Sequence, residues 1–259
     1  MKKVNLAVVG VTGMVGRTFI KVLEEKNLPI DKFYAFASKK SAGTKITFNG
    51  KEYEVEELKE DSFDRGIDIA LFSAGGETSR IFSPIAASKG CIVIDNSSCF
   101  RMDKDVPLVV PEVNPEDIAK NKGIIANPNC STIQAVVALK PLHDKYKIKR
   151  IVYSTYQAVS GAGRAGVLDL QNGIKGEAPK MFLHPIANNC IPHIDTFLDN
   201  GYTKEEMKMI NETRKILHDD SLKITATTVR VPVENSHSES INVEFYEKFD
   251  LDELIKDLE

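Results

Sequence analysis

Three glycines near the start of the chain constrain its fold most. Gly10, Gly13 and Gly16 follow the apolar run Val4–Val9 and precede a predicted helix over 15–25. Glycines at the end of a strand allow a tight turn and a close approach of a phosphate to the helix N-terminus. The spacing G-x-x-G-x-x-G is one residue longer than the usual dinucleotide fingerprint. The strand, loop and helix together still predict a pyrophosphate-binding loop.

The first half of the chain repeats this alternation of strand-length apolar runs and amphipathic helices. Such alternation is typical of βαβ units that build a parallel sheet. We predict parallel strands over 4–9, 33–37, 68–72, 91–94 and 124–126, helices over 15–25 and 78–88, and a hairpin over 44–55 that turns at Asn49-Gly50. The pattern predicts a Rossmann-like domain over residues 1–127.

The pattern changes after Pro128. Long strands are predicted over 149–159, 224–233 and 240–246, and the last alternates apolar and polar residues as a sheet with one covered face does. Thr203 and Glu206 form a capping-box signature that opens a helix. On that helix we expect one buried stripe: Met207, Ile210, Arg214 and Leu217. The fold class is therefore α/β, with a Rossmann-like parallel-sheet domain followed by an α+β domain over 128–259.

Charge and cysteine content exclude several classes of protein. Lys and Arg number 34 against 37 Asp and Glu, so the net charge of −3 gives no reason to expect nucleic acid or an anionic membrane as a partner. The four cysteines are too few for a disulfide scaffold, and no C-x-x-C pair suggests zinc. No apolar stretch approaches the ~20 residues of a membrane span. We expect a cytoplasmic protein without a metal.

The end of the second predicted strand distinguishes between the two nicotinamide cofactors. An NAD site normally offers Asp or Glu there for the ribose 2′-hydroxyl. This chain instead has the sequence Ala37-Ser-Lys-Lys-Ser41. Cations and hydroxyls suit a 2′-phosphate, so we predict NADP, although two lysines in a solvated loop would look the same.

A cysteine at a predicted helix start is the candidate nucleophile. Cys130 precedes the helical run over 133–139, where the helix dipole favours a thiolate. A dipole effect of ~1 kcal/mol lowers the pKa of a thiol by less than about one unit. An efficient nucleophile therefore needs a further partner, either a histidine or the positive nicotinamide ring.

His237 is the candidate partner among five histidines. We expect it in a polar loop over 234–239, between two strands. Arg230 lies on the face of the preceding strand opposite Val229, Val231 and Val233. A guanidinium beside a general base suits the binding of a carboxylate substrate near an acyl-transfer site.

These motifs together resemble the aspartate-β-semialdehyde dehydrogenase family along essentially the whole chain. The resemblance is carried, in order, by GVTGMVG from Gly10, the Ala-Ser-Lys-Lys-Ser loop, DNSSCFR ending at Arg101, NPNCST around Cys130, QAVSGAGRAG from Gln157, EEMKMINET from Glu205 and TTVRVPVENSHSES with Arg230 and His237. It implies an NADP-dependent phosphorylating aldehyde dehydrogenase that reduces β-aspartyl phosphate to aspartate semialdehyde and releases inorganic phosphate, on the way to lysine, methionine and threonine.

The resemblance also implies roles for individual residues. Cys130 would form a thioester, His237 would be the acid/base catalyst and Gln157 would orient the substrate. Arg230 would bind the substrate carboxylate and Glu205 its amino group. The phosphate would be held by Arg101, Asn129 and Lys208. The pyrophosphate would lie on Gly10, Thr12, Gly13, Met14 and Val15, the 2′-phosphate on Ser38, Lys39 and Ser41, and the nicotinamide near Ser160, Gly161 and Gly163. A homodimer, or a tetramer, is implied as well.

Two alternatives stay open on the sequence. N-acetyl-γ-glutamyl-phosphate reductase shares the thioester chemistry and an SGAGR-like stretch, but its acylated substrate has no need of Glu205. Family members also continue beyond residue 259, with a segment that closes the first domain. The chain is therefore expected to lack that segment, and an inactive NADP-binding or dimerising fragment is the second alternative.

Overall fold

The computed structural model describes residues 3–259, which form two compact units. Of the described residues, unit 1 comprises 3–109 and Asn114–Pro128, and unit 2 comprises Val110–Val113 and Asn129–Glu259. The main junction thus follows residue 128, whereas the sequence places the domain boundary after residue 127. The first two residues of the predicted first domain lie outside the described ones.

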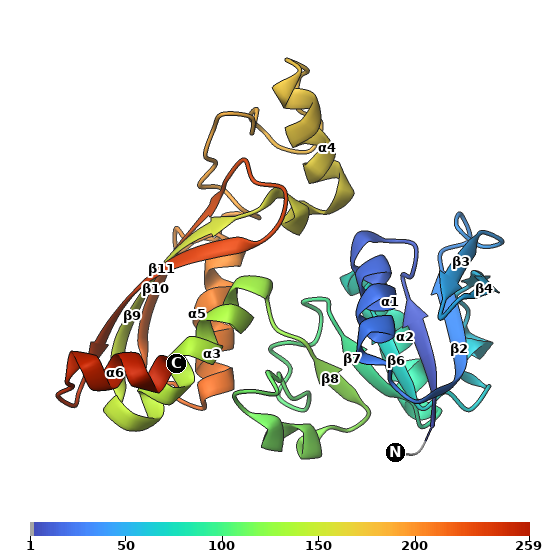
Figure 1. The fold of residues 1–259 in the computed structure, drawn as a ribbon, viewed down its shortest axis with the longest axis horizontal. Coiled ribbons are helices and arrows are strands. Elements are labelled where there is room, and N and C mark those ends of the chain that lie inside the picture. Colours follow the sequence, from blue (N-terminus) through green and yellow to red (C-terminus); the bar gives the residue numbers. More distant parts are fainter. Residues whose placement is uncertain (1–2) are drawn as a thin grey trace. The chain divides into compact units, whose positions relative to one another are not determined.

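Unit 1 is built on a six-stranded parallel sheet with the order β5-β2-β1-β6-β7-β8 (Figure 1). Its strands are β1 (Val4–Val9), β2 (Ile30–Ala37), β5 (Glu56–Glu57), β6 (Ile69–Phe72), β7 (Ile92–Asp95) and β8 (Ile124–Ala126). The five predicted parallel strands are therefore present. The sixth, β5, is a pair of glutamates beside the end of β2, and so short and acidic a segment carries no strand signal.

The helices of unit 1 connect neighbouring strands of this sheet. Helix α1 (Met14–Lys26) joins β1 to β2, and α2 (Gly76–Ser88) joins β6 to β7. These two crossovers run in opposite directions along the strand order, so right-handed connections place the helices on opposite faces. The hairpin β3 (Lys45–Phe48) and β4 (Lys51–Glu54) turns at Asn49-Gly50 as predicted. Two short 3-10 helices, η1 (Glu60–Phe63) and η2 (Pro115–Lys120), complete the unit.

Unit 2 is built on a three-stranded sheet with the order β10-β9-β11. Its central strand β9 (Ile148–Gln157) pairs parallel with β10 (Lys223–Arg230) and antiparallel with β11 (His237–Phe245). Helices α3 (Cys130–Tyr146) and α5 (Lys204–Leu217) pack on each other and on this sheet, as Figure 1 shows. The remaining elements are η3 (Val159–Ala162) and α4 (Gly163–Ile174) after β9, and the terminal helix α6 (Leu251–Leu258).

Two expectations for unit 2 are wrong in detail. Met207 and Arg214 lie half-buried at the edge of α5, and its buried residues form a wider face that contains Glu205, Glu206 and Glu212. Helix α5 packs against both β10 and α3, and contact with two elements buries a wider face than a single stripe of residues. His237 is the first residue of β11 rather than part of a loop, because the alternation of half-buried side chains starts there.

None of the helices within residues 3–259 has the length and apolar character needed to cross a bilayer.

Candidate active site

The register of the unit 2 sheet brings three of the predicted residues into one row. Gln157 on β9 pairs with Arg230 on β10 and with His237 on β11. Side chains at paired positions point to the same face of a sheet. The substrate-orienting, carboxylate-binding and acid/base candidates therefore lie side by side on the face that the helices cover, with Arg230 and Gln157 almost completely buried.

Cys130 faces this row from the first turn of α3. Asn129 is the N-cap, and its Oδ1 accepts hydrogen bonds from the backbone amides of Ser131 and Thr132. The cap places Cys130 at the positive end of the helix, which stabilises a thiolate. The Cys130 Sγ lies 3.0 Å from Nε2 of His237 and the residue is exposed. The helix dipole by itself is too weak to activate the thiol, and His237 lies within hydrogen-bond distance as the additional partner.

A backbone hydrogen bond determines which ring nitrogen of His237 carries the proton. The Ala158 amide donates to Nδ1 over 2.9 Å, so in the neutral ring the proton is on Nε2. Burial lowers the pKa of His237, and the charge of Arg230 lowers it further against the opposing effect of the Ser236 carbonyl. A neutral ring with Nε2–H directed at Sγ is the donor that a thiolate needs.

Arg230 is held by the same stretch of backbone. Its Nη1 donates to the Ala158 carbonyl over 2.6 Å, and its buried Nε has no hydrogen-bond partner among the described residues. Gly161 makes room for it, because a Cβ there would lie 2.8 Å from Nη1. Burial lowers the pKa of Arg230, yet an arginine side chain stays charged in proteins. The charge and the unpartnered Nε–H suit a substrate carboxylate.

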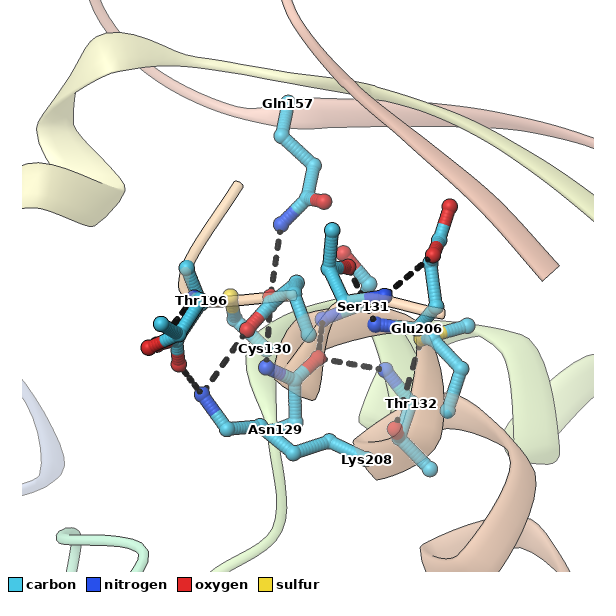
Figure 2. Close-up of polar contacts among 12 residues, drawn as sticks. Asn129, Cys130, Ser131, Thr132, Gln157, Thr196, Glu206 and Lys208 are labelled. Carbon is cyan, nitrogen blue, oxygen red and sulfur yellow. Dashed lines mark hydrogen bonds and ion pairs between the residues drawn. The ribbon is translucent and has the colours of Figure 1, made fainter. Parts of the chain in front are cut away.

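Glu205, the second residue of α5, accepts hydrogen bonds from three of the predicted site residues, Asn129, Gln157 and Lys208, which are labelled in Figure 2. Its Oε1 accepts from Asn129 Nδ2 at 2.9 Å and from Gln157 Nε2 at 3.0 Å, and its Oε2 accepts from Lys208 Nζ at 3.0 Å. Burial raises its pKa, but the Lys208 charge and the three hydrogen bonds outweigh that effect and hold the pKa below its usual value. Glu205 is therefore an ionised, buried anchor for three of the predicted site residues.

Two acidic residues of this network were not predicted. Asp195 accepts from Lys208 Nζ at 3.0 Å, so the lysine lies between two carboxylates. Despite the cost of burial, their charges raise the pKa of Lys208. Glu212 accepts from the Asn129 backbone amide at 2.6 Å and fixes the residue before the nucleophile. Glu212 lies two helical turns after Glu205, a spacing that could have indicated it, whereas nothing in the sequence points to Asp195.

The predicted phosphate ligand Arg101 belongs to unit 1, unlike Asn129 and Lys208. Its guanidinium donates to the backbone carbonyls of Asn127 at 2.9 Å and Asn96 at 3.1 Å, and the side chain is 8% exposed. In unit 1 it therefore joins two loops that follow β7 and β8.

The glycine loop of unit 1 borders a cavity of about 430 Å³. Its lining includes Gly10, Thr12 and Gly13 from the loop and Ser38 from the end of β2. Gly10 has φ +85° and packs on the backbone of Ser73, so no larger residue fits there. Thr12 Oγ1 donates to Ser41 Oγ over 3.4 Å and links the loop to the segment with the lysines. Met14 and Val15 begin α1 beside it.

The charge pattern at the rim of this cavity fits a 2′-phosphate. Lys39 is exposed beside Ser38, and no acidic residue ends β2. The acids on the strand beside the end of β2, Glu56 and Glu57 of β5, are paired with Arg65 and Lys59. The segment predicted near the nicotinamide, Ser160 to Gly163, lies in unit 2 as the turn η3 and the start of α4.

Comparisons with known proteins identify both units. The family profile "Semialdehyde dehydrogenase, NAD binding domain" matches residues 5–121, and "Semialdehyde dehydrogenase, dimerisation domain" matches residues 139–259. The aspartate-semialdehyde dehydrogenase of Aquifex aeolicus is 60% identical over 249 residues, which cover 93% of this chain and 73% of that protein. The Bacillus subtilis enzyme of the same name is 50% identical over 253 residues, again 93% of this chain and 73% of the relative.

Solved structures give the same result. Aspartate semialdehyde dehydrogenase II of Vibrio cholerae complexed with ASA superimposes with a TM-score of 0.96 at 49% identity, covering 100% of this chain and 79% of that one. The enzyme of Candida albicans with NADP gives a TM-score of 0.78 at 27% identity, covering 99% of this chain and 76% of that one.

Proposed function

Because the chain belongs to the aspartate-semialdehyde dehydrogenase family, we propose that unit 1 binds NADP and that unit 2 converts β-aspartyl phosphate to the semialdehyde through a thioester at Cys130. Membership makes the chain a phosphorylating oxidoreductase of aspartate-family amino-acid biosynthesis with an NAD(P)-binding domain and a dimerisation domain. The observation that carries the proposal is the row Arg230, Gln157 and His237 opposite Cys130.

The acyl-transfer step begins at the sulfur. With Nε2–H of His237 as its hydrogen-bond donor, the Cys130 thiolate attacks the acyl carbon of the substrate. A C–S bond forms, the C–O bond to phosphate breaks, and phosphate leaves with the electron pair and takes up one proton from water at the exposed site. NADPH, when bound, supplies the hydride that reduces the thioester to the aldehyde. Cys130 leaves again as thiolate, and His237 is the acid/base group at this centre.

The hydrogen-bond capacity of the network supports the predicted binding roles. A carboxylate has about four acceptor sites, and Glu205 uses three of them on protein donors. The fourth suits the substrate ammonium. Lys208 has three N–H donors, and carboxylates take two. The third suits a phosphate oxygen, as does the second N–H of Asn129. Arg101 remains the predicted phosphate ligand from unit 1.

The choice of NADP over NAD rests on the rim of the unit 1 cavity. Lys39, Ser38 and Ser41 provide a cation and two hydroxyls, and no carboxylate ends β2 to repel a 2′-phosphate. The relative from Candida albicans was solved with NADP. The glycine loop would hold the pyrophosphate, and Ser160, Gly161 and Gly163 would lie near the nicotinamide.

The decisive experiment is a reverse assay on the purified chain. NADP reduction should require both aspartate semialdehyde and inorganic phosphate, should be slower with NAD, and should be lost in Cys130→Ala. Activity only with N-acetylglutamate semialdehyde would instead support the reductase alternative. Absence of turnover with either aldehyde, in a chain that still binds NADP, would show that this polypeptide is the inactive fragment.

The oligomeric state and the cellular location of the protein are also part of the proposal. We expect a homodimer through unit 2, which matches the dimerisation profile; light scattering would distinguish it from a tetramer or a monomer. The uncovered face of its sheet carries Tyr156 with 47% exposure, so Tyr156→Asp should weaken the dimer. A cytoplasmic location is supported by four free cysteines, one of which is the nucleophile.

A further inference from the structure

A second polar row lies directly behind the catalytic row of unit 2. Thr155 on β9 pairs with Thr228 on β10 and with Glu239 on β11, two residues from Gln157, Arg230 and His237 respectively. Since side chains alternate along a strand, both rows face the covered side of the sheet. Thr155 and Thr228 are completely buried there. A polar layer at this depth is unusual because buried polar groups cost stability unless they are hydrogen-bonded.

Two members of this second row, the central Thr155 and Glu239 at one end, contact parts of the catalytic centre. Thr155 Oγ1 donates to Gln157 Oε1 over 3.0 Å, which turns the amide nitrogen of Gln157 towards Glu205. Glu239 Oε1 accepts from Gln134 Nε2 over 2.9 Å. Gln134 lies one helical turn after Cys130 on α3, and Glu239 lies two residues after His237 on β11.

The bond between Gln134 and Glu239 therefore runs beside the contact between Cys130 and His237 and joins the same two elements. It connects the helix that carries the nucleophile to the strand that carries its partner. A glutamate at position 239 costs stability, so packing alone does not explain it. Its Oε2 is buried without a hydrogen-bond partner among the described residues. Burial raises the pKa of Glu239 to about 7, although the hydrogen bond from Gln134 opposes that shift.

We propose that Glu239 and Gln134 are positioning residues that set the distance between Cys130 Sγ and His237 Nε2. This inference deepens the proposed function and rests on it. A displacement of a reacting group by about 1 Å can cost about 100-fold in rate. Neither side chain belongs to the groups that face the substrate, so their loss should change kcat and leave KM unaltered.

The test compares Glu239→Ala, Gln134→Ala, the double variant, and the exchanged pair Glu239→Gln with Gln134→Glu. Each single variant should lose about 10- to 100-fold in kcat with KM unchanged. The double variant should be no worse than the poorer single one, because both remove one bond. The exchanged pair, which restores an amide-to-carboxylate bond in the opposite sense, should recover most of the lost kcat. Glu244→Ala breaks an ion pair with Lys149 on the exposed face of β11 and should leave kcat unchanged.

A second readout needs neither substrate nor NADP. Alkylation of Cys130 by iodoacetamide should slow at neutral pH, and its pH profile should move upwards in both single variants, because the sulfur loses the aligned Nε2–H donor.

A wild-type chain without turnover would count against the proposed function, while this alkylation comparison would still decide the positioning role. Unchanged alkylation and kcat within about twofold in folded Gln134→Ala, or no recovery in a folded exchanged pair, would overturn the proposal. Gln134 is exposed on α3, so its truncation should not prevent folding if Glu239→Ala does.

Discussion

The candidate sites of the two units are built in different ways. The cavity of unit 1 lies beside the glycine loop, where Gly10 and Gly16 pack backbone against backbone, and its other walls come from the ends of β1 and β2, the segment after β6 and helix α2. The candidate catalytic centre of unit 2 is formed by side chains from α3, α5 and all three strands of its sheet. Steric fit limits the first site, whereas alignment of reactive groups limits the second. Substitutions should therefore separate binding from chemistry, and the following predictions test that separation.

The largest effect is expected at Cys130, the proposed nucleophile. Cys130→Ala should reduce turnover by about 10⁴-fold or more, because no other group can form the thioester. NADP binding by unit 1 should be unchanged, as measured by titration of cofactor fluorescence. Cys190→Ala is the matched control, since Cys190 is also exposed but lies outside the network. Loss of NADP affinity in Cys130→Ala would show that the two sites are not separable.

The converse effect is expected in the glycine loop. A Cβ on Gly16 would lie 2.3 Å from the Gly10 carbonyl oxygen and 2.7 Å from Val11 Cα. Gly16→Ala should therefore weaken NADP binding by about 100-fold and destabilise unit 1 by about 1–3 kcal/mol. Cofactor titration and urea unfolding measure the two effects. Alkylation of Cys130 in unit 2 should be unaffected.

Gly66→Ala is the control for backbone strain without a clash. Gly66 has a positive φ of +66°, which the helical Gly16 does not, and nothing lies within 4 Å of its Cβ position. The cost should be about 1 kcal/mol, with normal NADP affinity. Equal NADP affinity in the two alanine variants would contradict the steric account of the loop.

A pH-dependent effect on stability is expected from Glu239, the half-buried acid of β11. The pKa of Glu239 rises from 4.5 to about 7 on folding, so the folded chain holds the proton more tightly than the unfolded chain. The wild type should therefore lose about 1–3 kcal/mol relative to Glu239→Gln as pH rises from about 5 to 8, and nothing more above that. Urea unfolding at several pH values measures the difference. Glu244→Gln, on the exposed face, should show no such loss as pH rises.

The smallest effect is expected at the exposed rim of the unit 1 cavity. Lys39→Ala should weaken NADPH binding by about 10-fold, because one charge-assisted contact to the 2′-phosphate is lost. NADH binding should not change. Lys45→Ala, on the neighbouring hairpin, should alter neither affinity. Equal weakening of both cofactors by Lys39→Ala would argue against a 2′-phosphate contact.

Fold prediction succeeded where the signal is local. A continuous apolar run, an amphipathic pattern and an Asn-Gly turn identify β1, α1 and the hairpin β3–β4, because each of these signals lies within one short segment. The prediction failed for β5, which exists only because β2 offers an edge to pair with, and for the buried face of α5, which depends on packing against two elements. For the candidate site, motifs indicated Cys130, His237 and Arg230. Asp195 and Gln134 lie outside every motif, and the motif that contains Glu239 gives this residue no role, since only tertiary contacts connect the three to the centre.

The sequence by itself determined the fold class, the candidate nucleophile and the family, because glycine loops, a helix start and ordered motifs are properties of short segments. The tertiary structure decided the arrangement. Register places Gln157 between Arg230 and His237, and the Ala158 amide selects the ring nitrogen that faces the sulfur. It also assembles three donors on Glu205. Distances and proton positions arise from residues far apart in the chain, and no local pattern specifies how such residues meet.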